Sequence, residues 1–326
     1  MKRSMRTTAI LAAGLAAMGL SAQSVGAVEI PCSTARLIVP WGAGGESDIL
    51  KRVVLEGYNR LGGKPELQVV TITGQGGMKG WKAAINAKPD GCTLFSIHEH
   101  VLATNLTGRT NFTWDSLVPI ISLTKTPSLM GASPKTPFSN YKEMVEWTKA
   151  NPGKLLAAGT LGSTSHFSLL LVQDALGLPD MKVVSYDGTA DRMKALLAGT
   201  VHFAQVSEST GAKHVQSGAL KILGINTPAR SPRLPDVPTA TEQGYPLEIA
   251  STRGVMAPKG TPPEIIEYYA DMFEKAAKDK KVVETVEKMG SYMFVKRQDE
   301  YVKWWNDTNV EWTRIAKKVG VYKQGS

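Results

Sequence analysis

The chain has 326 residues, a formal net charge of +9, 42% hydrophobic residues and two cysteines. Charged residues make up only 21% of it, and a chain this rich in aliphatic side chains is not intrinsically disordered. Two cysteines exclude a disulfide-rich scaffold and a thiolate zinc cluster. The length exceeds what one hydrophobic core usually serves, so we expect two lobes.

Residues 1–27 are typical of a cleaved signal peptide. Three basic side chains precede the apolar stretch 9–20, and 25–27 offer small residues for a signal peptidase. The apolar stretch is shorter than the roughly 20 residues of a spanning helix; an uncleaved anchor is the alternative. Cleavage lowers the net charge to +6, a modest excess that suits small anions. No basic run with interleaved aromatics indicates nucleic acid.

Short apolar runs alternate with amphipathic stretches along the rest of the chain. The predicted strands are 36–40, 67–72, 93–97, 118–123, 154–158, 181–185, 201–206, 220–225 and 253–257. The predicted helices are 47–61, 78–87, 139–150, 164–177, 189–198, 208–217, 262–278, 280–289 and 297–319. This alternation predicts an α/β fold of mostly parallel sheets flanked by helices. Such sheets bind ligands in their strand-to-helix loops.

Cys32 and Cys92 each precede a predicted strand. If 36–40 and 93–97 are parallel neighbours, the starts of the two strands lie about 5 Å apart, within reach of a disulfide. An exported protein also meets an oxidising compartment. We therefore expect a disulfide, with two buried free thiols as the alternative.

The loop 40–48 follows a strand, opens a helix and is rich in glycine. Glycines let backbone N–H groups approach an anion, and a helix N-terminus favours negative charge. A dinucleotide fingerprint would need glycine where Ser47 stands, and the strand 67–72 ends without the acid that holds a ribose. No cofactor is therefore expected. Ser47 or Asp48 can also simply cap the helix.

Two further glycine-rich loops open helices. The loop 74–80 lacks the ending of a phosphate-binding loop, so a tight turn is the simpler interpretation. The loop 159–166 offers three hydroxyls and free N–H groups, which suit a carboxylate. It contains no Gly-x-Ser-x-Gly elbow, so nucleophilic catalysis by Ser163 and His166 is disfavoured. His166 as a structural hydrogen-bonding residue is the alternative.

His98 and His100 flank Glu99 after a predicted strand. Alternation puts both imidazoles on one side, as in some metal sites. No further ligand cluster completes such a site, so no metal is expected. His98 as a hydrogen-bonding residue of a pocket wall is the better interpretation.

An ordered set of motifs resembles one known family. The segments are 37–45 with Asp48 and Arg52, then 89–94, 199–203, 235–239, 242–246 and 257–262. Together they resemble the substrate-binding proteins of tripartite tricarboxylate transporters, also called the Bug family. The resemblance implies a periplasmic, type II-like binding protein in which two lobes close about a hinge on a small organic anion. Lobe 1 would comprise 28–130 plus 251–326, and lobe 2 would comprise 131–250.

The resemblance also nominates ligand-binding residues. The first loop contributes Trp41, Ala43, Gly44 and Gly45, and the facing loop contributes Gly162, Ser163, Thr164 and His166. His98 and the loop with Tyr186 and Asp187 complete the set, although the family usually has a basic residue where Asp187 stands.

Two departures from the family pattern lie near the first loop. Glu46 replaces a small residue and would repel an anion if it pointed inward. Arg253 stands where an aromatic is frequent, and its planar fork suits a second carboxylate; an interlobe salt bridge is the alternative.

The functional hypothesis is an extracytoplasmic receptor, not an enzyme. It would capture a di- or tricarboxylate and deliver it to membrane transporter subunits. A receptor for a signalling pathway and an exported hydrolase are the alternatives.

Overall fold

The computed structural model describes residues 28–179, 181–186 and 189–323. The predicted signal peptide and Asp187 lie outside them. The strands are β1 (Thr34–Val39), β2 (Glu66–Thr71), β3 (Thr93–Ile97), β4 (Leu117–Ala132), β5 (Leu156–Gly159), β6 (Lys182–Ser185), β7 (Phe203–Ser207), β8 (Lys221–Ile225), β9 (Ala250–Pro258) and β10 (Tyr292–Arg297). The helices are α1 (Glu46–Arg60), α2 (Met78–Ile85), α3 (His100–Leu106), α4 (Tyr141–Ala150), α5 (Thr164–Leu176), α6 (Thr189–Ala198), α7 (Glu208–Gln216), α8 (Pro263–Lys278), α9 (Lys280–Lys288) and α10 (Gln298–Lys318), with short 3-10 turns η1 (Gln75–Gly77) and η2 (Trp114–Ser116).

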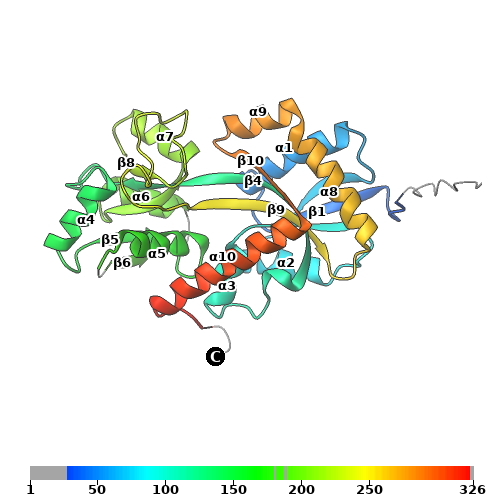
Figure 1. The fold of residues 1–326 in the computed structure, drawn as a ribbon, viewed down its shortest axis with the longest axis horizontal. Helices are drawn as coiled ribbons and strands as arrows, with labels where there is room; N and C mark the ends of the chain where they lie inside the picture. Colours follow the sequence, from blue (N-terminus) through cyan, green and yellow to red (C-terminus); the bar gives the residue numbers. More distant parts are fainter. Residues whose placement is uncertain (1–27, 180, 187–188, 324–326) are drawn as a thin grey trace, which may run out of the picture.

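The elements gather into two lobes joined by long strands (Figure 1). Lobe 1 holds β1, β2, β3, β9 and β10, and lobe 2 holds β5 to β8 with α4 to α7. The outer pairs are parallel: β1 lies between β2 and β3, and β5 lies between β6 and β7. The central pairs are antiparallel. The predicted α/β fold is thus confirmed, with more antiparallel pairing at its centre than the alternation suggested.

Strand β4 belongs to both lobes. Its residues up to Pro127 pair with β9, and its residues from Ser128 onward pair with β7. The chain returns just before β9, where the Ser128 N–H donates to the Ile249 carbonyl. The strand is 16 residues long instead of the predicted six, because polar residues at its middle interrupt the apolar run yet are buried where the lobes meet.

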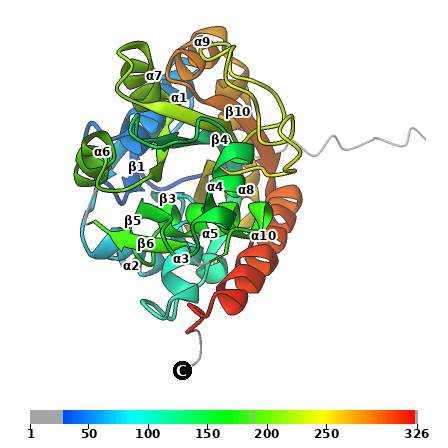
Figure 2. The ribbon, with the colours of Figure 1, turned by 90° about the vertical axis from the view of Figure 1, so that its left-hand side faces the viewer.

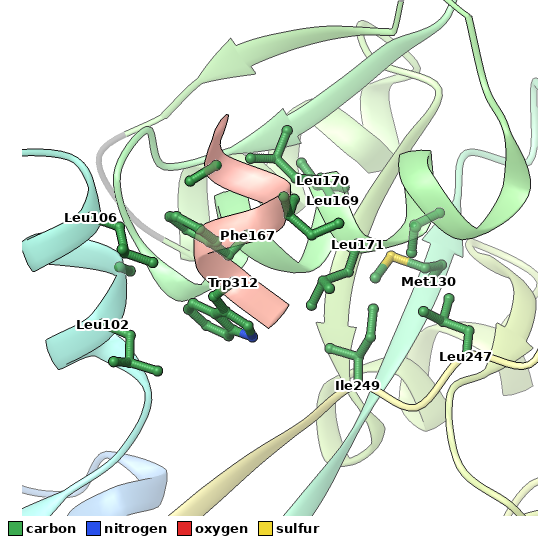
Figure 3. Close-up of a cluster of buried hydrophobic side chains, with 14 of the residues drawn as sticks. Leu102, Leu106, Met130, Phe167, Leu169, Leu170, Leu171, Leu247, Ile249 and Trp312 are labelled. Carbon is green, nitrogen blue, oxygen red and sulfur yellow. The ribbon is translucent and has the colours of Figure 1, made fainter. Parts of the chain in front are cut away.

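Helix α10 fastens the two lobes together. Its Trp312 stacks on Phe167 of α5 with ring centroids 4.7 Å apart, and Leu102 and Leu106 of α3 belong to the same buried cluster (Figure 3). Arg314 and Lys318 of α10 pair with Asp174 of α5. Figure 2, which looks onto lobe 2, shows α10 running beside α5. The hydrophobic core is therefore continuous across the lobe boundary.

The predicted disulfide is present. Cys32 and Cys92 are bonded, with their Cα atoms 6.0 Å apart. Strands β1 and β3 are parallel neighbours, with Arg36 opposite Thr93. The starts of two adjacent strands therefore bring the cysteines together, as the prediction assumed.

Each predicted strand and helix has a counterpart, and two elements were missed. Strand β10 is half-buried along its whole length, so its sequence shows no alternation between an apolar and a polar face. Helix α3 has seven residues, all of them buried, so it carries no amphipathic period. Both elements were missed because the prediction relied on the periodic spacing of apolar residues, which neither element shows.

Candidate functional site

The first glycine loop is held by its own side chains. The Gly44 N–H donates to the Asp48 carboxylate (2.8 Å), and the Gly45 N–H donates to the Gly42 carbonyl (3.2 Å). Gly44 has φ +78°, a conformation that favours glycine. Ala43, Gly44 and Gly45 are all exposed. Gly45 is the N-cap residue of α1, with no side-chain cap, so neither Ser47 nor Asp48 caps the helix as the alternative suggested.

The amides that remain available belong to the first turn of α1. The N–H groups of Glu46, Ser47 and Asp48 precede the first intrahelical bond, which Ile49 makes to Gly45. They have no partner among the described residues. Amides without a protein partner among the described residues therefore also follow Gly44 and Gly45, at the next three positions.

Trp41 is packed against both histidines. Its ring stacks on His98 at 5.2 Å and meets the edge of His100 at 5.1 Å. The His98 Nδ1 accepts a hydrogen bond from the His100 N–H, 3.3 Å away. Burial lowers the pKa of His98 well below its usual value and that of His100 to about 3, so both rings are neutral. His98 therefore positions the Trp41 indole.

The described ranges contain no group of three or more His, Cys, Asp or Glu side chains arranged to hold a metal ion.

Arg253 is buried, and its guanidinium already has four protein partners. It donates to Glu46 Oε2 (2.5 Å), Ser47 Oγ (3.0 Å), Thr126 Oγ1 (2.7 Å) and the Ser251 carbonyl (3.3 Å). The alternative of an interlobe salt bridge needs correction, because Glu46 lies in lobe 1 with Arg253. Glu46 does not stand as a free negative charge beside the loop, since it is the counter-ion of Arg253.

Lys51 lies behind this ion pair. It is 1% exposed, and its ammonium has no hydrogen-bond partner among the described residues. Burial, together with the charge of Arg253, lowers the pKa of Lys51 well below its usual value. Nothing in the helical pattern of α1 distinguished Lys51 from a solvated lysine.

The second glycine loop contains a chain of hydroxyls. The Ser163 Oγ donates to the Thr160 carbonyl (2.7 Å), and the hydroxyls of Ser163 and Ser165 are 2.9 Å apart. The Ser165 Oγ accepts from the Thr160 N–H (3.1 Å) and from Arg192 Nη1 (2.5 Å). The Ser163 hydroxyl thus donates its hydrogen bond within the loop, and no bond joins it to His166 among the described contacts. The pair therefore lacks the contact that nucleophilic catalysis requires.

His166 braces the same loop. Its Nδ1 accepts from the Gly162 N–H at 3.2 Å, and burial lowers its pKa, which favours this neutral acceptor form. The Ser163 N–H donates to the Thr160 carbonyl, 3.1 Å away. The next amides, those of Thr164, Ser165 and His166, open α5 and have no partner within the part of the chain that the structure describes.

Arg192 is a buried residue beneath the second loop that the sequence analysis did not select. It lies in α6, is 7% exposed, and donates to the hydroxyls of Ser165, Thr160 and Thr189. Its Nε has no partner, and no carboxylate of the described residues pairs with it. Among the described residues its printed partners are all hydroxyls, so a positive charge lies beneath the second loop. Arg192 shares a helix face with the buried Ala195 and Leu196, but the helical pattern does not show which groups lie opposite that face.

The loop with Tyr186 is tied to the second glycine loop. The Tyr186 N–H donates to the Gly159 carbonyl (2.9 Å), and its own carbonyl accepts from the Thr160 hydroxyl (2.7 Å). These bonds place Tyr186 beside the second glycine loop. It is half-buried against the core of lobe 2.

Helix α3 separates the two glycine loops. Trp41 contacts His100 at its first residue, whereas Gly162 packs against Thr107 and Arg109 just beyond its last residue. Arg109 also donates to the Leu161 carbonyl across the lobe boundary, at 3.3 Å. Seven helical residues span roughly 10 Å, so the two loops approach α3 at ends that far apart.

Three cavities lie elsewhere. One of about 950 Å³ lies between the loop 227–233 and the segment from α9 to β10, one of about 220 Å³ is lined by Glu99, and one of about 540 Å³ lies between α5 and the end of α10. Of the predicted ligand-binding residues, only His166 lines any of these three.

None of the described helices combines the length and the apolar composition needed to cross a bilayer.

Comparisons with known proteins agree over most of the chain. The family model described as "Tripartite tricarboxylate transporter family receptor" matches residues 51–321. A UPF0065 protein of Cupriavidus necator is 31% identical over 97% of this chain and 95% of its own length. Protein BugT of Bordetella pertussis is 29% identical over 97% of this chain and 98% of its own length.

Solved structures give the same result. The periplasmic binding protein BugD is 28% identical, with a TM-score of 0.72 over 89% of this chain and 99% of BugD. MatC from Rhodopseudomonas palustris, solved with bound malate, is 25% identical, with a TM-score of 0.71 over 86% of this chain and 98% of MatC. The chain therefore belongs to the tripartite tricarboxylate transporter receptor family and has the fold of its periplasmic binding proteins.

Proposed function

We propose that this protein is a periplasmic receptor that captures a small organic carboxylate between its lobes and delivers it to membrane transporter subunits. Family membership and the malate-bound relative MatC support this. The observation that carries the proposal is Arg192, a buried cation without a carboxylate partner among the described residues. Export through the predicted signal peptide at 1–27 belongs to the same proposal.

The second loop supplies what a carboxylate needs. A buried positive charge is costly unless an anion approaches it, and within the described ranges Arg192 bonds only neutral hydroxyls. The free amides of Thr164, Ser165 and His166 add the positive end of the α5 helix dipole. A ligand carboxylate bound at these amides would be stabilised by both.

The first loop offers a second set of amides. Those of Glu46, Ser47 and Asp48 open α1, a few residues after Trp41, which contacts the other end of α3. The two ends of α3 lie roughly 10 Å apart, a distance that a small dicarboxylate with bridging water could span from one loop to the other. A tricarboxylate needs a further cation, and Arg253 is held by Glu46. We therefore narrow the di- or tricarboxylate hypothesis to a dicarboxylate.

Capture would involve movement of one lobe against the other. We propose the division into 28–130 plus 251–326 and 131–250, with the hinge where β4 and the segment before β9 change lobes. The ligand would favour the closed state through contacts that only this state makes. Because α10 packs on both lobes, this helix limits the range of the motion.

Titration calorimetry with a panel of ligands tests the proposal. We expect four- to six-carbon dicarboxylates to bind, with weaker binding of monocarboxylates and no binding of neutral sugars. Binding of a sugar or an amide in the absence of carboxylate binding would overturn the receptor class. Uptake of the labelled ligand by cells with and without the chain tests delivery to a transporter rather than to a signalling pathway.

A further inference from the structure

Three polar atoms near the first loop are buried and have no partner among the described residues. They are the Glu46 Oε1, the Trp41 indole N–H and the Lys51 ammonium. Of the three residues, Glu46 is bonded directly to Arg253, whereas Trp41 precedes the same loop and stacks on His98. Buried polar atoms are nearly always hydrogen-bonded, and each exception requires an explanation.

Glu46 is fixed by its bond to Arg253. Its Oε2 accepts from Arg253, and Arg253 is held in turn by Ser47 and Thr126. The carboxylate is therefore not free to turn away from its position at the start of α1. Its second oxygen, Oε1, is left as an acceptor without a donor.

The two oxygens of Glu46 have different consequences for a ligand. A ligand carboxylate near Oε1 would be repelled, and Arg253 cannot offset this repulsion because its charge is already balanced. A hydroxyl or ammonium group would instead donate to Oε1 and satisfy it.

We propose that Glu46 determines specificity, favouring carboxylates that also carry a hydroxyl or an ammonium group over plain carboxylates of the same length. This inference rests on the proposed function. It adds the requirement for a hydroxyl or ammonium group on the ligand. The carboxylate-binding amides do not impose this requirement, since they recognise only the acid groups.

A matched ligand series tests it with the unmodified protein. Succinate, malate and aspartate share a four-carbon dicarboxylate skeleton and carry hydrogen, hydroxyl or ammonium at the second carbon. We expect at least one of malate and aspartate to bind about tenfold or more tightly than succinate, the scale of one satisfied buried acceptor. Tighter binding of aspartate identifies an ammonium donor, and tighter binding of malate identifies a hydroxyl donor. Equal binding of all three overturns the inference, because water would then satisfy Oε1 equally well.

Substitution of Glu46 gives the second arm. In Glu46→Ala the acceptor is lost and Arg253 is released, so the preference over succinate should vanish and succinate itself should bind more tightly. Glu56→Ala is the matched control: Glu56 lies on the same helix and pairs with Lys281, but it is exposed. It should leave the series unchanged.

An unchanged preference in folded Glu46→Ala overturns the assignment to Glu46. Thermal unfolding checks the fold of both variants, and if Glu46→Ala does not fold, the wild-type series alone decides. Failure of the proposed function has a different result, since then none of the three dicarboxylates binds the wild-type protein.

Discussion

The two glycine-rich loops differ in the charge that lies beneath them. Below the first loop, Arg253 is neutralised by Glu46 of the same lobe. Below the second loop, Arg192 is surrounded by hydroxyls and has no carboxylate partner in the described ranges. In both loops the first amides of a helix have no partner among the described residues, so the amides alone do not distinguish the loops. From this difference we expect lobe 2 to anchor the carboxylate of the ligand. Lobe 1 would then discriminate between ligands by their hydroxyl or ammonium groups.

Lobe 1 is also the more constrained partner. It contains the disulfide and a buried polar cluster that reaches Thr252 of β9 through Glu99. Lobe 1 is thus held by internal bonds, whereas the buried charge of lobe 2 is the proposed anchor of a ligand.

The largest expected effect concerns the constraint on lobe 1. Replacing both Cys32 and Cys92 by serine should lower the free energy of unfolding by about 4 kcal/mol, from the chain entropy of a loop of 60 residues. Urea denaturation measures the loss, and the reduced wild-type protein should behave like the double variant. Hydrogen exchange should show the loss of protection in β1 and β3 before β5 and β7. Equal loss in both lobes would contradict the separation.

The next effect is a pH dependence that arises from Glu99. Burial raises the pKa of Glu99 from 4.5 to about 7, although the bond from the Thr252 N–H and the charge of Arg253 act in the opposite direction. Between these two values the folded protein keeps a proton that the unfolded chain releases. Glu99 should therefore lower the stability by up to about 3 kcal/mol as the pH rises through this window, while His98 and His100, whose pKa values burial lowers, act in the opposite direction.

Glu99→Gln tests this assignment. Glutamine keeps an oxygen that accepts from Thr252 but does not titrate, so this part of the pH slope should disappear in denaturation experiments from pH 4.5 to 7. A slope identical to that of the wild-type protein would show that another group causes it.

The third prediction tests the comparison between the two arginines directly. Arg192→Gln should weaken dicarboxylate binding by about 1.5–3 kcal/mol, the scale of a hydrogen bond to a charged group. Arg253→Gln should chiefly lower the stability, because it leaves Glu46 without its counter-ion. Calorimetry and thermal unfolding of both variants separate the two effects. If the affinity loss belongs to Arg253 and not to Arg192, the assignment of the anchor to lobe 2 is wrong.

The smallest effect distinguishes two neighbouring serines. Ser165→Ala removes an acceptor of Arg192 and should weaken binding by about 1 kcal/mol. Ser163→Ala removes a hydroxyl that donates to the Thr160 carbonyl and should change affinity less. A larger loss for Ser163→Ala would mean that this hydroxyl contacts the ligand.

The sequence predicted what is local or follows from strand order. Alternating runs predicted most helices and strands, and two strand starts predicted the bond between Cys32 and Cys92. The motifs selected the two loops that we propose as the ligand site. The partners of the charged residues were not predictable, because Glu46 and Arg253 are 207 residues apart and Arg192 meets Ser165 from another helix. A residue pattern along one helix does not specify what lies opposite that helix in the fold.

The most direct test of the account is a crystal structure with a four-carbon dicarboxylate bound. We predict one carboxylate within hydrogen-bonding distance of the amides of Thr164 to His166, near Arg192, and the rest of the ligand directed toward the start of α1. A ligand bound instead in the cavity beside Arg230 and Arg233, with the two loops unoccupied, would contradict the account.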